Sequence, residues 1–170
     1  MNRATQASWK NLPLPDERVD LGFSAHFDDT EAEKLMHGLI PQQMEDKWFI
    51  YFESGWLSFH RSWSGVCIYA LRLDGSPAGV RVVESLVNRN LEQYQATDTD
   101  YDRKLVQFLI DALLLGKAVS FPMPKAIGDA PAGVVQHNLV GKAYPEVKAK
   151  KENPGFMKQI MTLFSGNKNV

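Results

Sequence analysis

Two sets of residues in this 170-residue sequence could bind or transform a ligand. His60 has an imidazole that can accept and donate protons, and Glu53 or an aspartate from residues 98–102, such as Asp98, could orient it as a partner carboxylate. Arg61 and Arg89 carry planar guanidinium groups that suit a phosphate. Together these residues would make a small hydrolase or transferase acting on a phosphorylated or nucleotide-like substrate. That hypothesis requires the fold to bring all of them to one pocket.

The second set mixes aromatic, polar and charged side chains in the region 47–74 and just after it. Exposed aromatic groups interleaved with His, Ser and Arg suit the recognition of a protein partner or a small ligand. This pattern therefore favours a binding surface over an active site. The candidate ligand-binding residues are Tyr51, Trp56, His60, Arg61, Trp63, Arg72, Asn88, Arg89 and Asn90.

Both sets also have a purely structural explanation. Arg72 could stack on Trp56 across an ordinary solvated sheet face, which needs no ligand. Arg61 could bury its stem under the sheet and pair with Asp98 or Asp100. From the residue types alone these structural explanations are preferred, and the elements that position the residues decide the question.

The region 47–74 is predicted to form three consecutive β-strands. Ser54-Gly55 fits a two-residue hairpin turn, which pairs Glu53 with Trp56. Strand alternation then places the side chains on two opposite faces. The apolar face holds Trp48, Ile50, Phe52, Leu57 and Phe59, and the mixed face holds Phe49, Tyr51, Glu53, Trp56, Ser58 and His60.

The second turn is predicted at residues 63–65, with Gly65 in the left-handed conformation of a three-residue loop. A two-residue loop would turn the third strand over, so this register is the less secure of the two. The three-residue loop pairs Ser62 with Val66, His60 with Ile68 and Trp56 with Arg72, and adds Cys67, Tyr69, Leu71 and Leu73 to the apolar face.

Along the chain, one helix is predicted before the strands and another after them. Residues 28–31 have the capping pattern of a helix N-terminus, and the helical spacing of the apolar residues that follow predicts a helix that ends at Gly38. The turn at residues 74–77 leads into a fourth strand near residues 79–87, although helix is an alternative there. A second helix is predicted over residues 101–115, with Leu105, Phe108, Leu109, Ala112 and Leu115 as its buried stripe.

These elements predict an α+β fold, an antiparallel meander sheet of four or more strands with helices packed on one face. Residues 1–145 form a single domain, in which residues 1–20 are an extended arm anchored by Trp9 and Leu14, and residues 21–27 are a short edge strand. Residues 146–170 are a charged linker and a short amphipathic helix over residues 156–164.

Composition excludes several classes of function. The net charge of −1 argues against bulk binding to nucleic acid or to an anionic membrane. Cys67 is the single cysteine, the four histidines are scattered, and no phosphate-binding or metalloprotease motif occurs, so no metal and no cofactor is expected. The chain lacks a signal peptide and a membrane-spanning run, which predicts a cytoplasmic location.

Two blocks of sequence resemble small bacterial proteins of unassigned function. They are HRSWSG at residues 60–65 and LVNRNLEQY with TDTDYD within residues 86–102, accompanied by IDALLLG at residues 110–116. This resemblance implies no activity. We therefore expect a binding or regulatory domain that recognises a protein partner or a small ligand through the mixed face and the HRSWSG hairpin. The enzyme described above is the alternative, and the mixed face would also serve as a homodimer interface.

Overall fold

The structure, a computed structural model, describes residues 2–123, and all elements named below lie in that range. Its sheet is antiparallel and has the strand order β1-β6-β5-β4-β3, with β2 pairing with another part of β6. The predicted α+β meander is confirmed, because four consecutive strands are neighbours in this sheet. The strands are β1 (Arg18–Asp20), β2 (His26–Phe27), β3 (Trp48–Glu53), β4 (Trp56–Arg61), β5 (Cys67–Ser76) and β6 (Gly79–Asn88).

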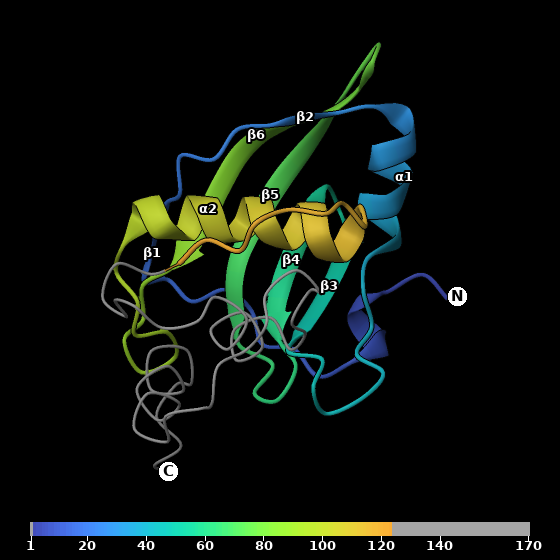
Figure 1. Ribbon diagram of the computed structural model, residues 1–170. Coiled ribbons are helices and arrows are strands. Elements are labelled where there is room, and N and C mark those ends of the chain that lie inside the picture. The colour runs from blue at the N-terminus through green and yellow to red at the C-terminus, as the bar shows by residue number, and fades with distance from the viewer. Residues whose placement is uncertain (1, 124–170) are drawn as a thin grey trace.

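Two helices cover the same sheet. Helix α1 (Asp29–His37) lies beside β3, and helix α2 (Thr99–Leu109) crosses one face of the strands (Figure 1). The predicted apolar stripe of α2 is buried, but a π-helical turn η2 (Ile110–Leu114) replaces its last α-helical turn. A short 3₁₀ helix η1 (Gln6–Ser8) lies near the N-terminus.

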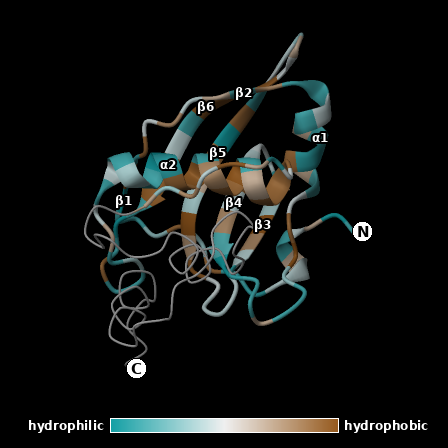
Figure 2. Cartoon of the chain, viewed as in Figure 1, coloured by the Kyte–Doolittle hydropathy of each residue, from teal (hydrophilic) through white to brown (hydrophobic). Residues whose placement is uncertain are grey.

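The main hydrophobic core lies between α2 and the sheet. Brown segments of α2 and of the central strands face each other in Figure 2. The ring of Tyr69 in β5 stacks with Trp48 and meets the edge of Phe59, so aromatic groups fill the centre of this layer. Leu105 and Leu109 of α2 are fully buried against the same layer.

The first hairpin has the predicted register. Ser54 and Gly55 both have positive φ angles, as the two-residue turn requires, and Glu53 pairs with Trp56. Phe49 pairs with His60 as predicted. The mixed and apolar faces of β3 and β4 are therefore assigned correctly.

The predicted register of the second hairpin is wrong at its turn end. Trp56 pairs with Arg72 as predicted, but a β-bulge after Phe59 sets His60 opposite Cys67 instead of Ile68. The Arg61 amide donates to the Val66 carbonyl, which leaves a four-residue loop with Gly65 at φ +78°. The extra residue moves Cys67 from the apolar face to the mixed face.

The N-terminal arm is more ordered than predicted. Residues 18–20, assigned to the arm, form β1 on the edge of β6, and only His26–Phe27 of the predicted strand 21–27 pairs with β6. Gly22 separates the two pieces with a left-handed turn (φ +69°), and its amide donates to the side chain of Asp20. The Trp9 indole donates to the Ser62 carbonyl at 2.7 Å, so Trp9 anchors the arm as expected.

Helix α1 begins at a reciprocal cap that allows a direct test. The Asp28 carboxylate accepts from the Glu31 amide at 2.8 Å, and the Glu31 carboxylate accepts from the Asp28 amide at 3.1 Å. We expect Asp28→Ala to lower the free energy of unfolding by about 1 kcal/mol, because one amide loses its acceptor. The control Asp29→Ala keeps the cap and should cost less in the same urea titration; equal losses would contradict the role of the cap.

Several predicted segments lie outside the described residues. These are the end of the domain beyond residue 123, the linker at 146–155 and the helix at 156–164. Within residues 2–123, every helix is too short or too polar to cross a bilayer.

Candidate functional site

The mixed face is organised in rows that run across the strands. The first row is Glu53, Trp56, Arg72 and Glu84, each paired with the next. Adjacent strands lie about 4.8 Å apart, so this row spans about 14 Å. The Arg72 guanidinium lies 3.7 Å from the Glu84 carboxylate, and both side chains are about half exposed. Trp56 is half-buried, so its ring lies between an acid and a base at an accessible surface.

The second row carries fewer charged and polar side chains than the first. It runs through Tyr51, Ser58, Ala70 and Leu86. Tyr51, Ser58 and Leu86 are half-buried. Partial burial raises the pKa of the Tyr51 phenol above its ordinary value, so this phenol is neutral and can donate a hydrogen bond.

The third row is covered, which corrects the prediction that the His60 imidazole faces solvent. Phe49, His60 and Cys67 are at most 2% exposed, although they lie on the face opposite α2. The imidazole stacks on the Tyr51 ring with centroids 5.4 Å apart and packs near Phe49. Burial lowers the pKa of His60 below its ordinary value. His60 is therefore a covered residue and not a contact for an outside ligand.

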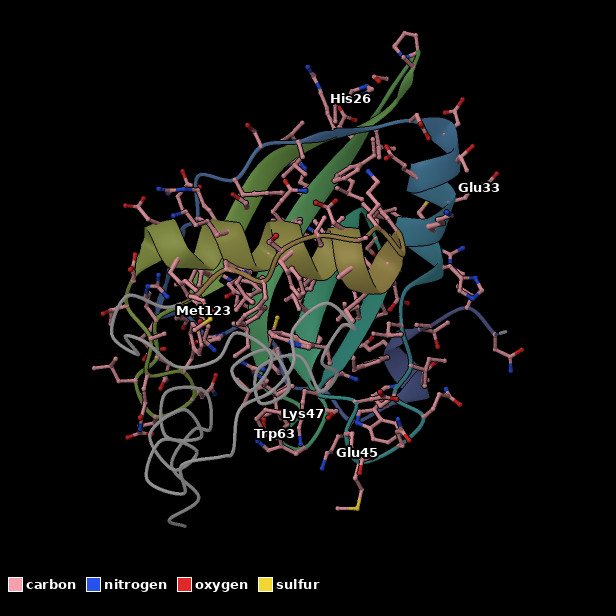
Figure 3. All side chains as sticks on the ribbon, viewed as in Figure 1. His26, Glu33, Glu45, Lys47, Trp63 and Met123 are labelled. Carbon is pink, nitrogen blue, oxygen red and sulfur yellow. The ribbon has the colours of Figure 1, made fainter. Side chains whose placement is uncertain are left out.

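Arg61, the next residue, lies on the opposite face in an aromatic cage. Its guanidinium carbon lies 4.1 Å from the ring centre of Trp48 and 5.2 Å from that of Trp63, and the side chain is 1% exposed. Burial lowers the pKa of Arg61 to about 10, so the group is still charged at neutral pH. The amine of Lys47 approaches Trp63 at 5.7 Å, and Figure 3 shows these two side chains side by side at the lower end of the sheet.

A buried carboxylate connects α2 to the sheet close to Arg61. Asp102 is fully buried and accepts hydrogen bonds from the hydroxyls of Tyr69 at 2.7 Å and Tyr94 at 2.6 Å. Its second oxygen forms a 2.6 Å ion pair with Arg89. Arg89 also donates to the hydroxyl of Thr99 and to the carbonyls of residues 88 and 96. In this set, named the Asp102 network, both terminal nitrogens of the Arg89 guanidinium donate to groups of the protein itself.

Two asparagines of the predicted site have structural partners as well. The Asn88 amide donates to the Cys67 carbonyl and to the Gln93 side chain, while its oxygen accepts from the Asn90 backbone. The Asn90 oxygen accepts from the Glu92 amide. These bonds shape the turn between β6 and α2, and they use both asparagines.

The HRSWSG block is likewise explained by local contacts. Ser62 donates its hydroxyl to the Asp46 carbonyl, Ser64 accepts from the Val66 amide, and Gly65 provides the left-handed turn. With His60 under one face and Arg61 under the other, each residue has a packing or hydrogen-bonding role. The residues of the HRSWSG block are therefore explained by the fold of this loop.

Two surface hollows lie along α2, away from the mixed face. One, of about 410 Å³, is lined by Phe23, by residues of α2 that include Lys104 and Gln107, and by residues of the segment after α2. The other, of about 250 Å³, contains Asp98, Asp100 and Arg103. Asp98 caps α2 by accepting from the Tyr101 amide, so its carboxylate already has a structural role at the start of that helix.

The structure brings some predicted residues together and separates others. The open part of the mixed face contains Tyr51, Trp56 and Arg72. On the opposite face of the sheet, the one covered by α2, Asp102 interacts with Arg61 and Arg89. His60 has no carboxylate partner among residues 2–123, because Glu53 lies four residues along β3 from Phe49 and Asp98 lies at the start of α2.

Sequence reasoning missed Tyr69 and Tyr94 as members of this interior site, and it considered Asp102 only as one of the acidic residues within 98–102. In the sequence Asp102 looks like one more acidic residue after a helix cap, yet its position on the buried stripe of α2, three residues before Leu105, is a signal of burial. Among residues 2–123 no cluster of three His, Cys, Asp or Glu side chains could hold a metal ion. No protein-family model, curated protein or solved structure matches the chain.

Proposed function

We propose that the chain is a non-catalytic binding domain that recognises a protein partner through the first two rows of the mixed face. The aromatic, polar and charged residues of these rows, named the open patch, are Tyr51, Glu53, Trp56, Ser58, Arg72 and Glu84. The observation that carries the proposal is that two half-buried aromatic rings lie among three accessible charges on this face, while the basic groups of the enzymatic alternative are held in the interior.

The chemistry of the open patch favours a protein surface over a small molecule. Neither of the two hollows beside α2 is lined by a member of the patch. Aromatic rings at the centre with charges at the rim are typical of protein interfaces. Glu53 and Glu84 bracket the single base Arg72, so the partner should offer an apolar group beside a Lys or Arg.

Photo-crosslinking inside cells tests this proposal even though the partner is unidentified. A benzophenone amino acid replaces Arg72, and a matched protein carries it at Glu33, which lies exposed on α1 and points outward in Figure 3. We expect a discrete adduct with another protein from position 72 and none from position 33. Trp56→Thr, which keeps strand preference, should remove that adduct while leaving the melting temperature nearly unchanged.

The outcomes separate the alternatives. The same adducts from both positions, or an adduct that persists in Trp56→Thr, would contradict the open patch as the binding surface. An adduct between two copies of this chain would assign the patch to a homodimer interface and overturn the partner proposal.

A further inference from the structure

The N-terminal segment crosses the ends of the central strands as a strap, defined here as residues 4–15. The backbone amide of Ala4 donates to the His37 carbonyl at 2.8 Å, next to β3. The indole of Trp9 and the amide of Leu12 then reach the loop between β4 and β5, and Figure 1 shows the segment running along the lower end of the sheet toward β1. Most strap residues are exposed, so it is held mainly by a few hydrogen bonds.

The strap lies directly against the backbone beside the third row. A Cβ on Gly65 would lie 3.2 Å from the Asn11 backbone, so the two segments are in close contact. Phe49 and Cys67 are buried but do not belong to the main core under α2, and they form a separate layer with His60 on the strap side. The strap therefore contacts the loop that borders this small aromatic layer, and the layer continues the open patch.

One carbonyl oxygen joins the strap to the imidazole. The Gly65 oxygen accepts from the Leu12 amide at 2.8 Å and meets Nδ1 of His60 at 2.9 Å. Since a carbonyl only accepts, Nδ1 carries the proton of the neutral ring, and Nε2 is bare. Nε2 is buried and has no hydrogen-bond partner among the described residues. A second proton would thus create a buried cation whose new N–H has no acceptor there.

The titratable groups that face the imidazole do not compensate such a charge. They are the phenol of Tyr51 on β3 and the thiol of Cys67 on β5, and burial raises the pKa of both, so both are neutral near and below neutral pH. The nearest strap residues, Asn11 and Leu12, are uncharged, and Lys10 beside them is exposed and basic.

We propose that the strap is a latch held by the neutral imidazole: when His60 takes up a proton, residues 4–15 leave the sheet and expose the third row. Burial lowers the pKa of His60 from 6.5, so closure is fully stabilised above that pH. The stabilisation is lost as the pH falls below 6.5 toward the pKa of the covered ring. Regulation of partner binding by this latch rests on the function proposed above, whereas the release is measured on the free protein.

The test is an NMR titration of the full chain from about pH 7.5 to about pH 5, the range in which histidine titrates. We expect the Leu12 amide to lose about tenfold or more of its hydrogen-exchange protection and the Trp9 indole to shift to the position of a hydrated indole. Both changes should coincide with the titration of the His60 ring, while the amides of Leu71 and Val106 stay protected.

Two non-titrating variants and one control complete the design. His60→Phe and His60→Gln should keep the Leu12 amide protected at the low pH, whereas His26→Gln, at an exposed histidine near the β5–β6 hairpin, should behave as the natural chain. If one of the two His60 variants releases the strap at every pH, the other His60 variant is the one that tests the latch. Release at the same pH in both variants, a closed strap with a protonated His60, or simultaneous loss of Leu71 protection would each overturn the latch.

Discussion

Replacing Asp102 with asparagine is expected to lower the free energy of unfolding by about 3–5 kcal/mol, which is typical when one member of a buried ion pair is removed. The variant keeps the volume of the side chain but leaves the guanidinium of Arg89, only 13% exposed, without its counter-charge. It also weakens the acceptor for the hydroxyls of Tyr69 and Tyr94. Urea unfolding followed by circular dichroism measures the loss.

The matched control is Asp100→Asn, two residues earlier in the same helical turn. Asp100 is exposed and pairs with Arg103, so its change should cost about 0.5 kcal/mol or less. In a double-mutant cycle, Arg89→Met combined with Asp102→Asn should cost less than the sum of the two single changes. Additive losses, or an Asp102→Asn protein as stable as the control, would show that the Asp102 network contributes little.

A second large effect is expected at Gly79, where β6 begins. Gly79 has φ +131°, and an added Cβ would overlap the Phe27 carbonyl oxygen and lie 2.9 Å from the Cα of Asp28. The clash is with backbone, which cannot rotate away as a side chain does. We therefore expect Gly79→Ala to destabilise the fold by about 2–5 kcal/mol, from backbone strain and overpacking together. A thermal melt and a urea titration would both report it.

Gly75 provides the comparison in the same hairpin. An added Cβ there meets nothing within 4 Å, and its φ is not in the left-handed region. Gly75→Ala should change stability by about 0.5 kcal/mol or less. If Gly79→Ala and Gly75→Ala unfold at the same temperature and the same urea concentration, β2 is not packed on β6 as the structure has it.

Most of the fold could be predicted because its signals are local. The two-residue turn at Ser54-Gly55 determined the pairing of β3 with β4, and alternation then sorted the faces. The apolar stripe of α2 located the covering helix. Each of these features depends on residues that are neighbours along the chain or across one short turn.

The second hairpin could not be predicted as reliably because its turn is not determined by its own residues. Gly65 indicated a left-handed position, but not the bulge that inserts Ile68. Ser62 bonds to residues 46 and 47, and the strap bonds to Gly65, so contacts from distant segments shape this loop. A single extra residue then moved Cys67 to the other face.

The candidate site was only partly predictable for a related reason. Alternation placed His60 on the mixed face correctly, but it did not show that the ring is buried, and the loop residue Gly65 that binds the ring is itself bound by Leu12 from far earlier in the sequence. Arg89 looked available for a ligand because its acceptor, Asp102, also had a plausible local role at the start of a helix. Residue type alone does not distinguish a ligand-binding group from one that a long-range partner within the fold already uses.

The position of Cys67 determines how this chain can be labelled. It is the single cysteine, it is buried, and burial raises the pKa of its thiol to about 12. The thiol is therefore protonated at neutral pH, whereas the thiolate is the form that alkylating reagents attack. A maleimide dye or spin label can therefore be directed to an introduced surface cysteine, for example at Glu33, while the natural cysteine stays in place.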